Sequence, residues 1–414
     1  MSKRTFTNTL YTNDNLYVLS GMNSESVDLI YLDPPFNSKR MYSAPVGSKA
    51  AGASFKDMWT WQDVDEYYLD SLADNFPALA KYIASIGQAH SKPMMAYLTY
   101  MSQRIIEMHR VLKETGSLYL HCDPTASHYL KILLDFIFGK NCFRNEIVWC
   151  YTGPGSPKMR QFNRKHDVIF WYSKGNKWTF NMDCVRFPHS EKTKENFKSG
   201  LAGSGFVGAP REIDEKGKVP ETWWSDIAIV ARSKYENTGY PTQKPLALLK
   251  RIILASSNEG DTVLDPFCGC ATTCVAAQQL QRKWVGIDIE KQAASILIQR
   301  LSDAPGRLFR DFVATNQIPK RGDLKTVPPS ESIKQRLYKE QDGKCNACGR
   351  DFAIWDFEID HIIPKARGGG DYYENYQLLC GSCNRIKGAR PMEYVRMKIE
   401  MRERMMKTQI FFGE

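Results

Sequence analysis

The sequence has no long apolar run, and this absence sets the first limits on what the protein can be. No stretch approaches the roughly 20 apolar residues that cross a bilayer, and the opening MSKRTFTNTLYTND lacks the apolar core of a secretory signal. A disulfide framework is also not expected from 11 cysteines in 414 residues. The sequence therefore predicts a soluble, cytoplasmic protein without a membrane partner.

An excess of acidic residues is missing as well, and the balance is basic. The net charge is +10, and residues 151–250 hold 17 Lys and Arg against 10 Asp and Glu. Basic side chains bind nucleic acid without sequence preference by neutralising phosphates, although an ordinary solvated surface has a similar composition. With 43% apolar residues, the chain is long enough for two or three domains.

A carboxylate and an aromatic ring stand on either side of two prolines in the segment LDPPF, residues 32–36. The apolar run VDLIYL before it is typical of a buried strand, which the prolines end. Each proline fixes its own φ and restricts the residue before it. We therefore expect Asp33, the Pro34 carbonyl and Phe36 in one fixed geometry at the C-terminal edge of a sheet, where open α/β sheets bind ligands.

Strands and helices alternate along most of the chain. Residues 14–150 predict a β–α–β–α order, and this rhythm returns from KPLALLKRIILASS (244–257) onward. Such an order is typical of an α/β fold with a mostly parallel sheet. Residues 151–240 are basic, tryptophan-containing and rich in loops, and residues 303–332 have the Pro, Gly and charge of a linker.

A second turn, LDPFCGCATT (264–273), lies between a predicted strand and a predicted helix. It has one central glycine, Gly269, and lacks the G-x-G-x-x-G spacing that lets a backbone approach a pyrophosphate. Asp288 lies 23 residues after Asp265, at the end of the next strand. S-adenosylmethionine, a nucleoside cofactor without phosphate, fits both features, with its ammonium group at Asp265 and its ribose at Asp288. A plain strand–turn–helix is the alternative.

In combination, these motifs resemble the permuted, beta-class amino-methyltransferases of DNA. The other matching segments are HCDPTASHYLK (121–131), NEIVW (145–149), HDVIFWYSK (166–174), PTQKPLALL (241–249) and VGIDIE (285–290). The resemblance implies a Rossmann-like, S-adenosylmethionine-dependent methyltransferase over residues 1–318, with a target-recognition insert at 151–240. The cofactor site that it implies consists of Asp265, Pro266, Phe267, Gly269, Thr272, Thr273, Asp288 and Lys244.

The same resemblance assigns Asp33, Pro34, Pro35 and Phe36 to catalysis. The exocyclic amine of a base is a poor nucleophile, because its lone pair is delocalised into the ring. Two acceptors aimed at its hydrogens draw the nitrogen toward tetrahedral geometry, and Asp33 and the Pro34 carbonyl are two such acceptors. Phe36 can stack on a base that has left the duplex. Asp at the first position favours adenine N6, with cytosine N4 as the alternative.

Cysteines form two pairs near the C-terminus, CNAC and CGSC. Two such pairs make a tetrahedral site of four thiolates, and zinc is its usual occupant. The expected ligands are Cys345, Cys348, Cys380 and Cys383. Because all four sulfurs would bind the metal, the zinc is expected to be structural and to cross-link a domain of about 60 residues. Unrelated free thiols are the alternative.

The segment FEIDHIIPKARGGGDYYENYQLLC, followed by CNRIKG, resembles the HNH nuclease family. The resemblance implies a small ββα-metal domain in which Asp360 and Asn384 hold a divalent cation, Mg²⁺ or Mn²⁺. Asn384 stands at the third signature position in place of histidine. His361 would take a proton from the attacking water, and Asn375 would orient His361 through its backbone carbonyl.

The sequence thus predicts a two-activity enzyme that acts on double-stranded DNA. A methyltransferase (1–318), a linker (319–332) and an HNH endonuclease domain with a terminal helix (333–414) would make a single-chain restriction–modification protein. Two alternatives stay open: a C-terminal domain that only binds DNA, and a nicotinamide-dependent dehydrogenase with a zinc module, which leaves DPPF unexplained. The sequence does not determine the recognised DNA site or whether the chain acts as a dimer.

Overall fold

The computed structural model of the protein divides into two compact units. The first holds Met1–Thr12, Glu25–Met58 and Leu112–Thr315, and the second holds Asn13–Ser24, Trp59–Val111 and Asn316–Glu414. The structure describes residues 8–36, 40–45, 47–48, 50–51, 54–57, 72–73, 76–153, 160–198, 213–232, 236–290, 292–302, 312–323, 333–365, 369–371 and 373–411. In this part of the chain, no helix is both long and apolar enough to span a bilayer.

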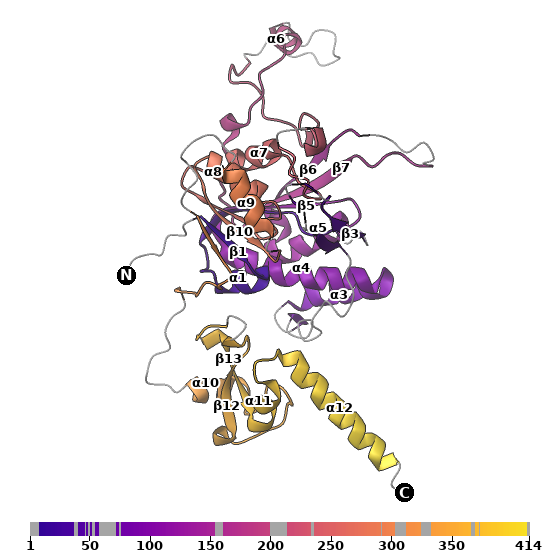
Figure 1. Ribbon diagram of the computed structural model, residues 1–414, viewed down its shortest axis with the longest axis vertical. Coiled ribbons are helices and arrows are strands. Elements are labelled where there is room, and N and C mark those ends of the chain that lie inside the picture. Colours follow the sequence, from indigo (N-terminus) through magenta and orange to yellow (C-terminus); the bar gives the residue numbers. More distant parts are fainter. Residues whose placement is uncertain are drawn as a thin grey trace. The chain divides into compact units, whose positions relative to one another are not determined.

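The described strands of the first unit form a nine-stranded sheet in the order β11–β1–β10–β9–β2–β5–β7–β6–β8 (Figure 1). In chain order they are β1 (Thr9–Thr12), β2 (Val27–Leu32), β5 (Leu112–Cys122), β6 (Phe143–Cys150), β7 (His166–Ser173), β8 (Trp223–Trp224), β9 (Thr262–Asp265), β10 (Lys283–Asp288) and β11 (Val313–Thr315). Neighbours from β11 to β5 pair in parallel, whereas β7 runs antiparallel to β5 and β6, and β8 is parallel to β6. The predicted α/β fold with a mostly parallel sheet is confirmed.

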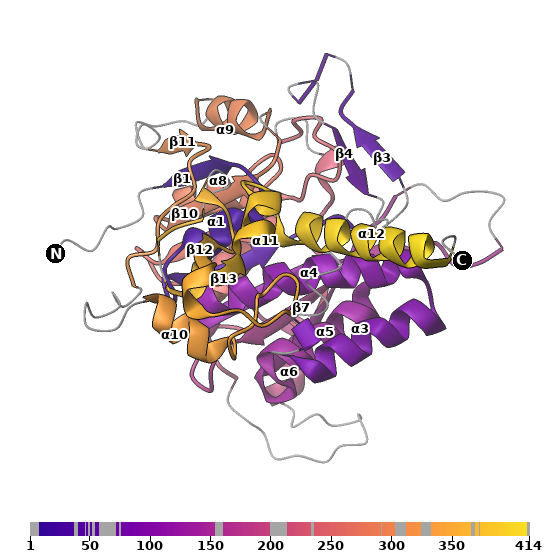
Figure 2. The same ribbon diagram turned by 90° about the horizontal axis from the view of Figure 1, so that it is seen from below.

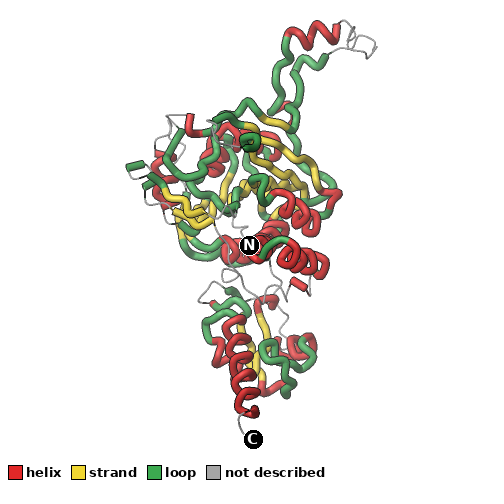
Figure 3. The backbone as a smooth tube through the Cα atoms, turned by 90° about the vertical axis from the view of Figure 1, so that its right-hand side faces the viewer, coloured by secondary structure: helices red, strands yellow, loops and turns green. Residues whose placement is uncertain are grey.

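Helices accompany this sheet, as the tube in Figure 3 shows. The helices of the first unit are α5 (Ser127–Phe138), α6 (Glu191–Lys198), α7 (Leu246–Ser256), α8 (Thr272–Gln279) and α9 (Gln292–Ser302), and β3 (Arg40–Ser43) and β4 (Ser54–Asp57) form a separate antiparallel pair. Buried side chains of α7 and α8, such as Ile252 and Val275, pack in one core with Leu29 of β2 and Val263 of β9. Burial of this apolar surface holds the central strands in register.

β2 is the buried strand that the sequence predicts at VDLIYL. It pairs with β9 on one side and β5 on the other, and all its residues except Asp28 are buried. Asp28 accepts hydrogen bonds from Lys113 (2.7 Å) and from the Thr262 backbone N–H (2.9 Å), which ties the start of β2 to both neighbours. At its other end, Pro34 and Pro35 stop the strand because neither can donate to a sheet.

The predicted insert contains an arm that extends beyond the sheet and carries α6 (Figure 1). Phe187 and Lys218 pair through two backbone hydrogen bonds of 2.8 and 2.9 Å, which joins the two legs of the arm. Of the tryptophans in this region, Trp171 and Trp224 are buried in the core, whereas Trp223 is 60% exposed. Residues 154–159, 199–212 and 233–235 of the predicted insert lie outside the described residues.

The N-terminal part of the second unit consists of helices whose segments alternate along the sequence with segments of the first unit. They are α1 (Asn15–Gly21), α3 (Pro77–Ala89) and α4 (Lys92–Val111), and α3 and α4 lie side by side (Figure 2). Arg104 of α4 binds Asp14 (3.0 Å) and Asn15 (2.6 Å). The first residues of the predicted linker are tied to the end of α1, since the Gly322 and Ser24 backbone N–H groups donate to Asn23 and Asp323, respectively.

A small ββα element lies in the C-terminal part of the second unit. It consists of the antiparallel pair β12 (Phe357–His361) and β13 (Tyr376–Cys380), followed directly by α11 (Gly381–Lys387). The flanking helices are α10 (Ile333–Glu340) and the 20-residue α12 (Met392–Phe411). Phe357, Leu378 and Leu379 are buried between them, so this small core is built around the predicted cysteine cluster. The ββα fold predicted for this segment is confirmed.

Candidate functional site

Three acidic side chains end neighbouring strands at one edge of the sheet. Asp33 directly follows β2, Asp265 is the last residue of β9, and Asp288 is the last residue of β10. β9 pairs in parallel with both β2 and β10, so these carboxyl ends point the same way. From β9 the chain continues through α8 to β10, whereas β2 has β5 on its other side. Open α/β sheets bind their ligands at such a switch point.

Backbone N–H groups of the turn after β9 bind both Asp265 and Asp288. Gly269 has a φ of +49°, and a Cβ there would lie 3.0 Å from the ring of Tyr240. Only glycine adopts this conformation without strain, and it also leaves room for Tyr240. The Gly269 N–H donates to Asp288 Oδ2 at 2.7 Å. Ala271, also with a positive φ, caps α8.

The carboxyl groups of Asp265 and Asp288, which this turn contacts, are poorly solvated. Asp265 is 4% exposed and accepts hydrogen bonds from the Thr273 hydroxyl and the Phe267 N–H. Burial raises the pKa of Asp265 to about 7 and that of Asp288 to about 6, although hydrogen bonds from their neighbours oppose this effect. A cation or strong hydrogen-bond donor placed against either carboxylate would therefore be stabilised. A nucleoside that carries an amino acid offers both, through its ammonium group and its ribose hydroxyls.

The other predicted cofactor residues hold the turn in shape or lie in it. Thr272 accepts a hydrogen bond from Arg300 at 2.9 Å, and Arg300 also donates to the Cys270 carbonyl at 2.7 Å. Thr273 is bound to Asp265. Pro266 and Phe267 lie in the turn itself.

Lys244, predicted to bind the cofactor, lies against the other half of the site. Its ammonium donates to Asp33 Oδ2 at 2.6 Å and lies 5.2 Å from the ring centroid of Phe36. Lys244 is 9% exposed, and Asp33 Oδ1 is buried without a hydrogen-bond partner among the described residues. A buried acceptor without a donor is costly, so Oδ1 is an open position for a donor that a ligand supplies.

Sequence reasoning missed the residue on the inner side of Phe36. The rings of Phe36 and His121 lie nearly parallel, at 22°, with their centroids 6.2 Å apart. His121 is fully buried and bound to Asp167. His121 lies in the segment HCDPTASHYLK and Asp167 in HDVIFWYSK. The sequence motifs therefore contain both residues, but they do not show that the two side chains meet.

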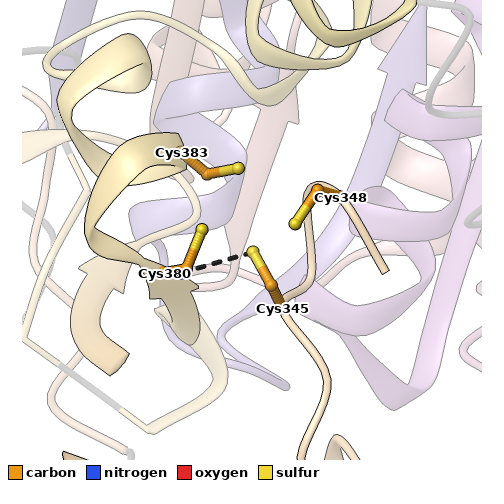
Figure 4. A group of neighbouring side chains, drawn as sticks. All are labelled: Cys345, Cys348, Cys380 and Cys383. Atoms are coloured by element: carbon orange, nitrogen blue, oxygen red, sulfur yellow. Dashed lines mark hydrogen bonds between the residues drawn. The ribbon is translucent and has the colours of Figure 1, made fainter. Parts of the chain in front are cut away.

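The four predicted cysteines converge in the small ββα element (Figure 4). Their Sγ atoms all lie within 4.8 Å of one another, and the Cys380 N–H donates to Cys345 Sγ at 3.3 Å. Four sulfurs bound at about 2.3 Å to one zinc ion would be about 3.8 Å apart. Burial raises the pKa of Cys345, but backbone hydrogen bonds outweigh burial and lower this pKa below its usual value. The cluster therefore fits a structural zinc site.

Asp360 and Asn384, the expected ligands of a second cation, lie on the facing sides of β12 and α11. Asp360 is 9% exposed and accepts from Gln377 (2.8 Å) and, at 2.9 and 3.1 Å, from the buried Lys387. Asn384 donates to Glu358. A carboxylate has about four lone-pair positions, so three such contacts leave one for a metal. The Lys387 ammonium opposes the charge of a cation at this position.

His361 is held by residues other than the predicted one. Its Nε2 lies 2.8 Å from Asp371 Oδ1, and Tyr376 packs against the ring edge to face at 5.0 Å between centroids. Hydrogen bonds from Lys365 and His361 lower the pKa of Asp371 to about 2, so this carboxylate is ionised at neutral pH. The Asn375 carbonyl instead accepts from the Ile362 N–H, and its side chain binds Ile363 and Gly370. Asn375 thus shapes the loop beside His361.

Comparison with known proteins gives two family matches and several relatives. A family model described as DNA methylase matches residues 27–299, and one described as HNH endonuclease matches residues 345–390. Type II methyltransferase M.EcaI of Enterobacter cloacae is 30% identical over 276 residues, which are 53% of this chain and 60% of that protein. DNA adenine methyltransferase YhdJ of Escherichia coli K12 is 28% identical over 328 residues, covering 78% and 93%. The solved cytosine-N4-specific PvuII DNA methyltransferase has a TM-score of 0.46 at 15% identity, covering 76% of this chain and 97% of its own.

Proposed function

The chain belongs to the DNA methylase family and carries an HNH endonuclease domain, and on this premise we propose that it methylates adenine N6 in double-stranded DNA. S-adenosylmethionine is the proposed methyl donor. The observation that supports the proposal most is Asp33, held by Lys244 through Oδ2, with Oδ1 buried and without a donor in the part of the chain that the structure describes. A base amine supplies the missing hydrogen-bond donor.

The proposed chemistry at Asp33 is hydrogen-bond acceptance. Asp33 Oδ1 and the Pro34 carbonyl accept the two hydrogens of the target amine, which localises its lone pair for attack. Lys244 keeps the carboxylate in place, and Phe36 stacks on the base after it leaves the duplex. Pro35 fixes the distance between acceptor and ring. Holding the amine beside the methyl group of a bound cofactor would supply much of the rate.

The cofactor would be held by the turn after β9. Asp265 meets the ammonium group, Asp288 meets the ribose hydroxyls, and the bound cofactor supplies an electrophilic methyl group. The raised pKa values of both carboxyls support this placement, because a ligand with a positive group relieves their unfavourable burial. On this assignment Lys244 serves the base side, where the structure places it against Asp33.

Cofactor affinity should rise with pH between about 5 and 7. The pKa of Asp265 is raised to about 7, so its carboxyl is still largely protonated at pH 5, whereas the ammonium group needs it ionised. Affinity should therefore increase by up to about tenfold per pH unit below that pKa. Without ligand, the sign for stability is opposite: the folded chain holds this proton more tightly than the unfolded chain, so stability is lost as pH rises toward 7. Calorimetry with S-adenosylmethionine should also detect proton release.

Asp265→Asn is the matched control for this pH effect. It keeps the shape of the side chain and an acceptor oxygen, but it has no proton to lose. We expect weaker and nearly pH-independent binding. A wild-type affinity that does not change from pH 5 to 8 would remove Asp265 from the cofactor site.

Adenine is preferred over cytosine for two reasons. The first residue of DPPF is Asp, and YhdJ, which covers 78% of this chain, is named a DNA adenine methyltransferase. Residues 151–240 are proposed to read the DNA sequence, since they hold 15 Lys and Arg against 10 Asp and Glu and carry an exposed Trp223. Expression in a host without adenine methylation, followed by nucleoside mass spectrometry and long-read sequencing, tests base and site together. N4-methylcytosine as the product would reject the adenine assignment.

For the C-terminal domain we favour DNA cleavage, with His361 as general base and Mg²⁺ or Mn²⁺ held by Asp360 and Asn384. The supporting observation is the ionised Asp371, which accepts from His361 Nε2 and leaves Nδ1 to take a proton. A non-cleaving DNA-binding domain is the second candidate, favoured by the pairing of Asp360 with Lys387. Residues 1–318, 319–332 and 333–414 remain the proposed methyltransferase, linker and nuclease segments.

Zinc should copurify at about one ion per chain, and Cys383→Ser should remove it. Structural zinc supplies about 10–16 kcal/mol of binding free energy to small domains, so loss of one thiolate should unfold the ββα element. Methyl transfer should persist, because its proposed residues lie in the first unit. Metal analysis by mass spectrometry and limited proteolysis are the measurements. Cys184→Ser, which changes an exposed cysteine outside the cluster, is the control; wild-type protein without zinc would refute the site.

A further inference from the structure

A buried chain of polar side chains links β2, β5 and β7 behind the DPPF loop. His121, near the end of β5, has Nδ1 2.9 Å from the Tyr31 hydroxyl of β2 and Nε2 3.0 Å from Asp167 Oδ2 of β7. Tyr151 donates to the other Asp167 oxygen at 3.1 Å. These strands are neighbours in the sheet, so the chain runs across the strands rather than along one. The proposed chemistry uses none of these four residues.

The hydrogen bonds among these four side chains determine how the His121 ring is held. Hydrogen bonds from His121 and Tyr151 keep the pKa of Asp167 below its usual value against the effect of burial, so the carboxylate accepts. Nε2 therefore carries a hydrogen, and Nδ1 is hydrogen-bonded to the Tyr31 hydroxyl. Both ring nitrogens are then satisfied, as a fully buried imidazole requires. Two anchors on opposite sides of the ring fix its plane.

The same ring has Tyr31, Trp149 and Phe36 as aromatic neighbours. Trp149 meets His121 edge to face at 5.9 Å, and Phe36 lies nearly parallel to it. Phe36 belongs to a loop, not to a strand or helix, so its orientation depends on what it packs against. His121 is the aromatic ring against its inner side, while the Lys244 ammonium lies 5.2 Å from its centroid.

We infer that His121 is a positioning residue for methyl transfer, which holds Phe36 in the plane where the extruded base stacks. Asp167 and Tyr31 hold His121, so the rigid sheet sets the angle of a loop residue. This inference rests on the proposed stacking role of Phe36. A base that stacks at the wrong angle presents its amine away from Asp33, so the effect of losing His121 should pass through Phe36.

A double-mutant cycle distinguishes this role from a general effect on folding. The variants are His121→Ala, Phe36→Ala and the two together, assayed by single-turnover transfer of tritiated methyl groups to unmethylated plasmid DNA. Loss of base stacking corresponds to roughly 5- to 150-fold, and His121→Ala should lose about tenfold or more. The double variant should be no slower than Phe36→Ala alone, because the two residues act in series. S-adenosylmethionine affinity should stay within about twofold.

Two further variants keep the test interpretable if His121→Ala is poorly folded. Tyr31→Phe removes one anchor without opening a cavity, and its smaller loss should also vanish in the Phe36→Ala background. His128→Ala changes an exposed histidine of the same sequence segment and should match the wild type.

Two results would overturn the inference. One is a His121→Ala rate equal to that of His128→Ala. The other is a loss that multiplies in full with that of Phe36→Ala. If Phe36→Ala itself transfers methyl groups at the wild-type rate, the proposed stacking role fails, and the inference fails with it for that separate reason.

Discussion

Asp33→Ala should reduce methyl transfer below detection while S-adenosylmethionine still binds with nearly wild-type affinity. Asp33 is assigned to the base, and its buried Oδ1 has no hydrogen-bond donor among the described residues. Removal of one preorganised electrostatic group typically costs about 10²–10³-fold, and here the partner Lys244 would also lose its counter-ion. A tritium-transfer assay and calorimetry with the cofactor measure the two effects separately.

Lys244→Met is the informative companion to this variant. If Lys244 acts through Asp33, its loss should slow transfer and leave cofactor affinity unchanged. If Lys244 binds the cofactor, as the sequence alone suggested, affinity should fall first. Transfer by Asp33→Ala within a few-fold of the wild type would remove Asp33 from the mechanism, whatever Lys244 does.

His361→Ala should lower DNA cleavage by roughly 10²–10⁴-fold, the usual contribution of a general base. Methylation should not change, because His361 and Asp33 belong to different units. Cleavage should require added Mg²⁺ or Mn²⁺, since zinc in the cysteine cluster has no open position for substrate. The assay is plasmid digestion by metal-depleted protein with each cation added back. Asp342→Ala, which changes an exposed carboxylate near the cysteine cluster, is the control.

Methylating the plasmid beforehand lets the same experiment test whether methylation protects DNA from cleavage. If one chain both marks and cuts, DNA that the protein has already methylated should resist it. Equal cutting by wild type and His361→Ala would refute the nuclease assignment. Equal cutting of methylated and unmethylated plasmid would keep the nuclease but reject the restriction–modification role. No cutting by the wild type with either cation would favour a DNA-binding domain, consistent with the buried Asp360–Lys387 pair.

The sequence predicted those features that short segments determine by themselves. Two prolines after an apolar run end β2 wherever the strand lies, so the position of Asp33 at a strand end followed from local chain geometry. Two C-x-x-C pairs likewise indicated the cysteine cluster. Gly269 was identified from its place in the turn, and its positive φ explains why the turn contains glycine.

Contacts between distant segments were not predictable, because a motif gives residue types and not the partner of each atom. Lys244 meets Asp33 across 211 residues, so only the folded sheet shows this contact. Asp360 carries the signature of a metal ligand, yet most of its acceptor capacity is used by Lys387 and Gln377. Asp371 has no place in the motif and still binds His361.

The pairing of β2 with β9 also determines when the site can exist during synthesis. The two strands are neighbours in the sheet, but the Thr262-to-Asp28 hydrogen bond between them spans 234 residues. Closing so long a loop is slow compared with local helix formation. During synthesis on the ribosome, the edge of β2 that pairs with β9 therefore stays unpaired until β9 emerges. Unpaired strand edges are prone to aggregation. The order of the segments in the gene thus places completion of this edge of the site late in the synthesis of the chain.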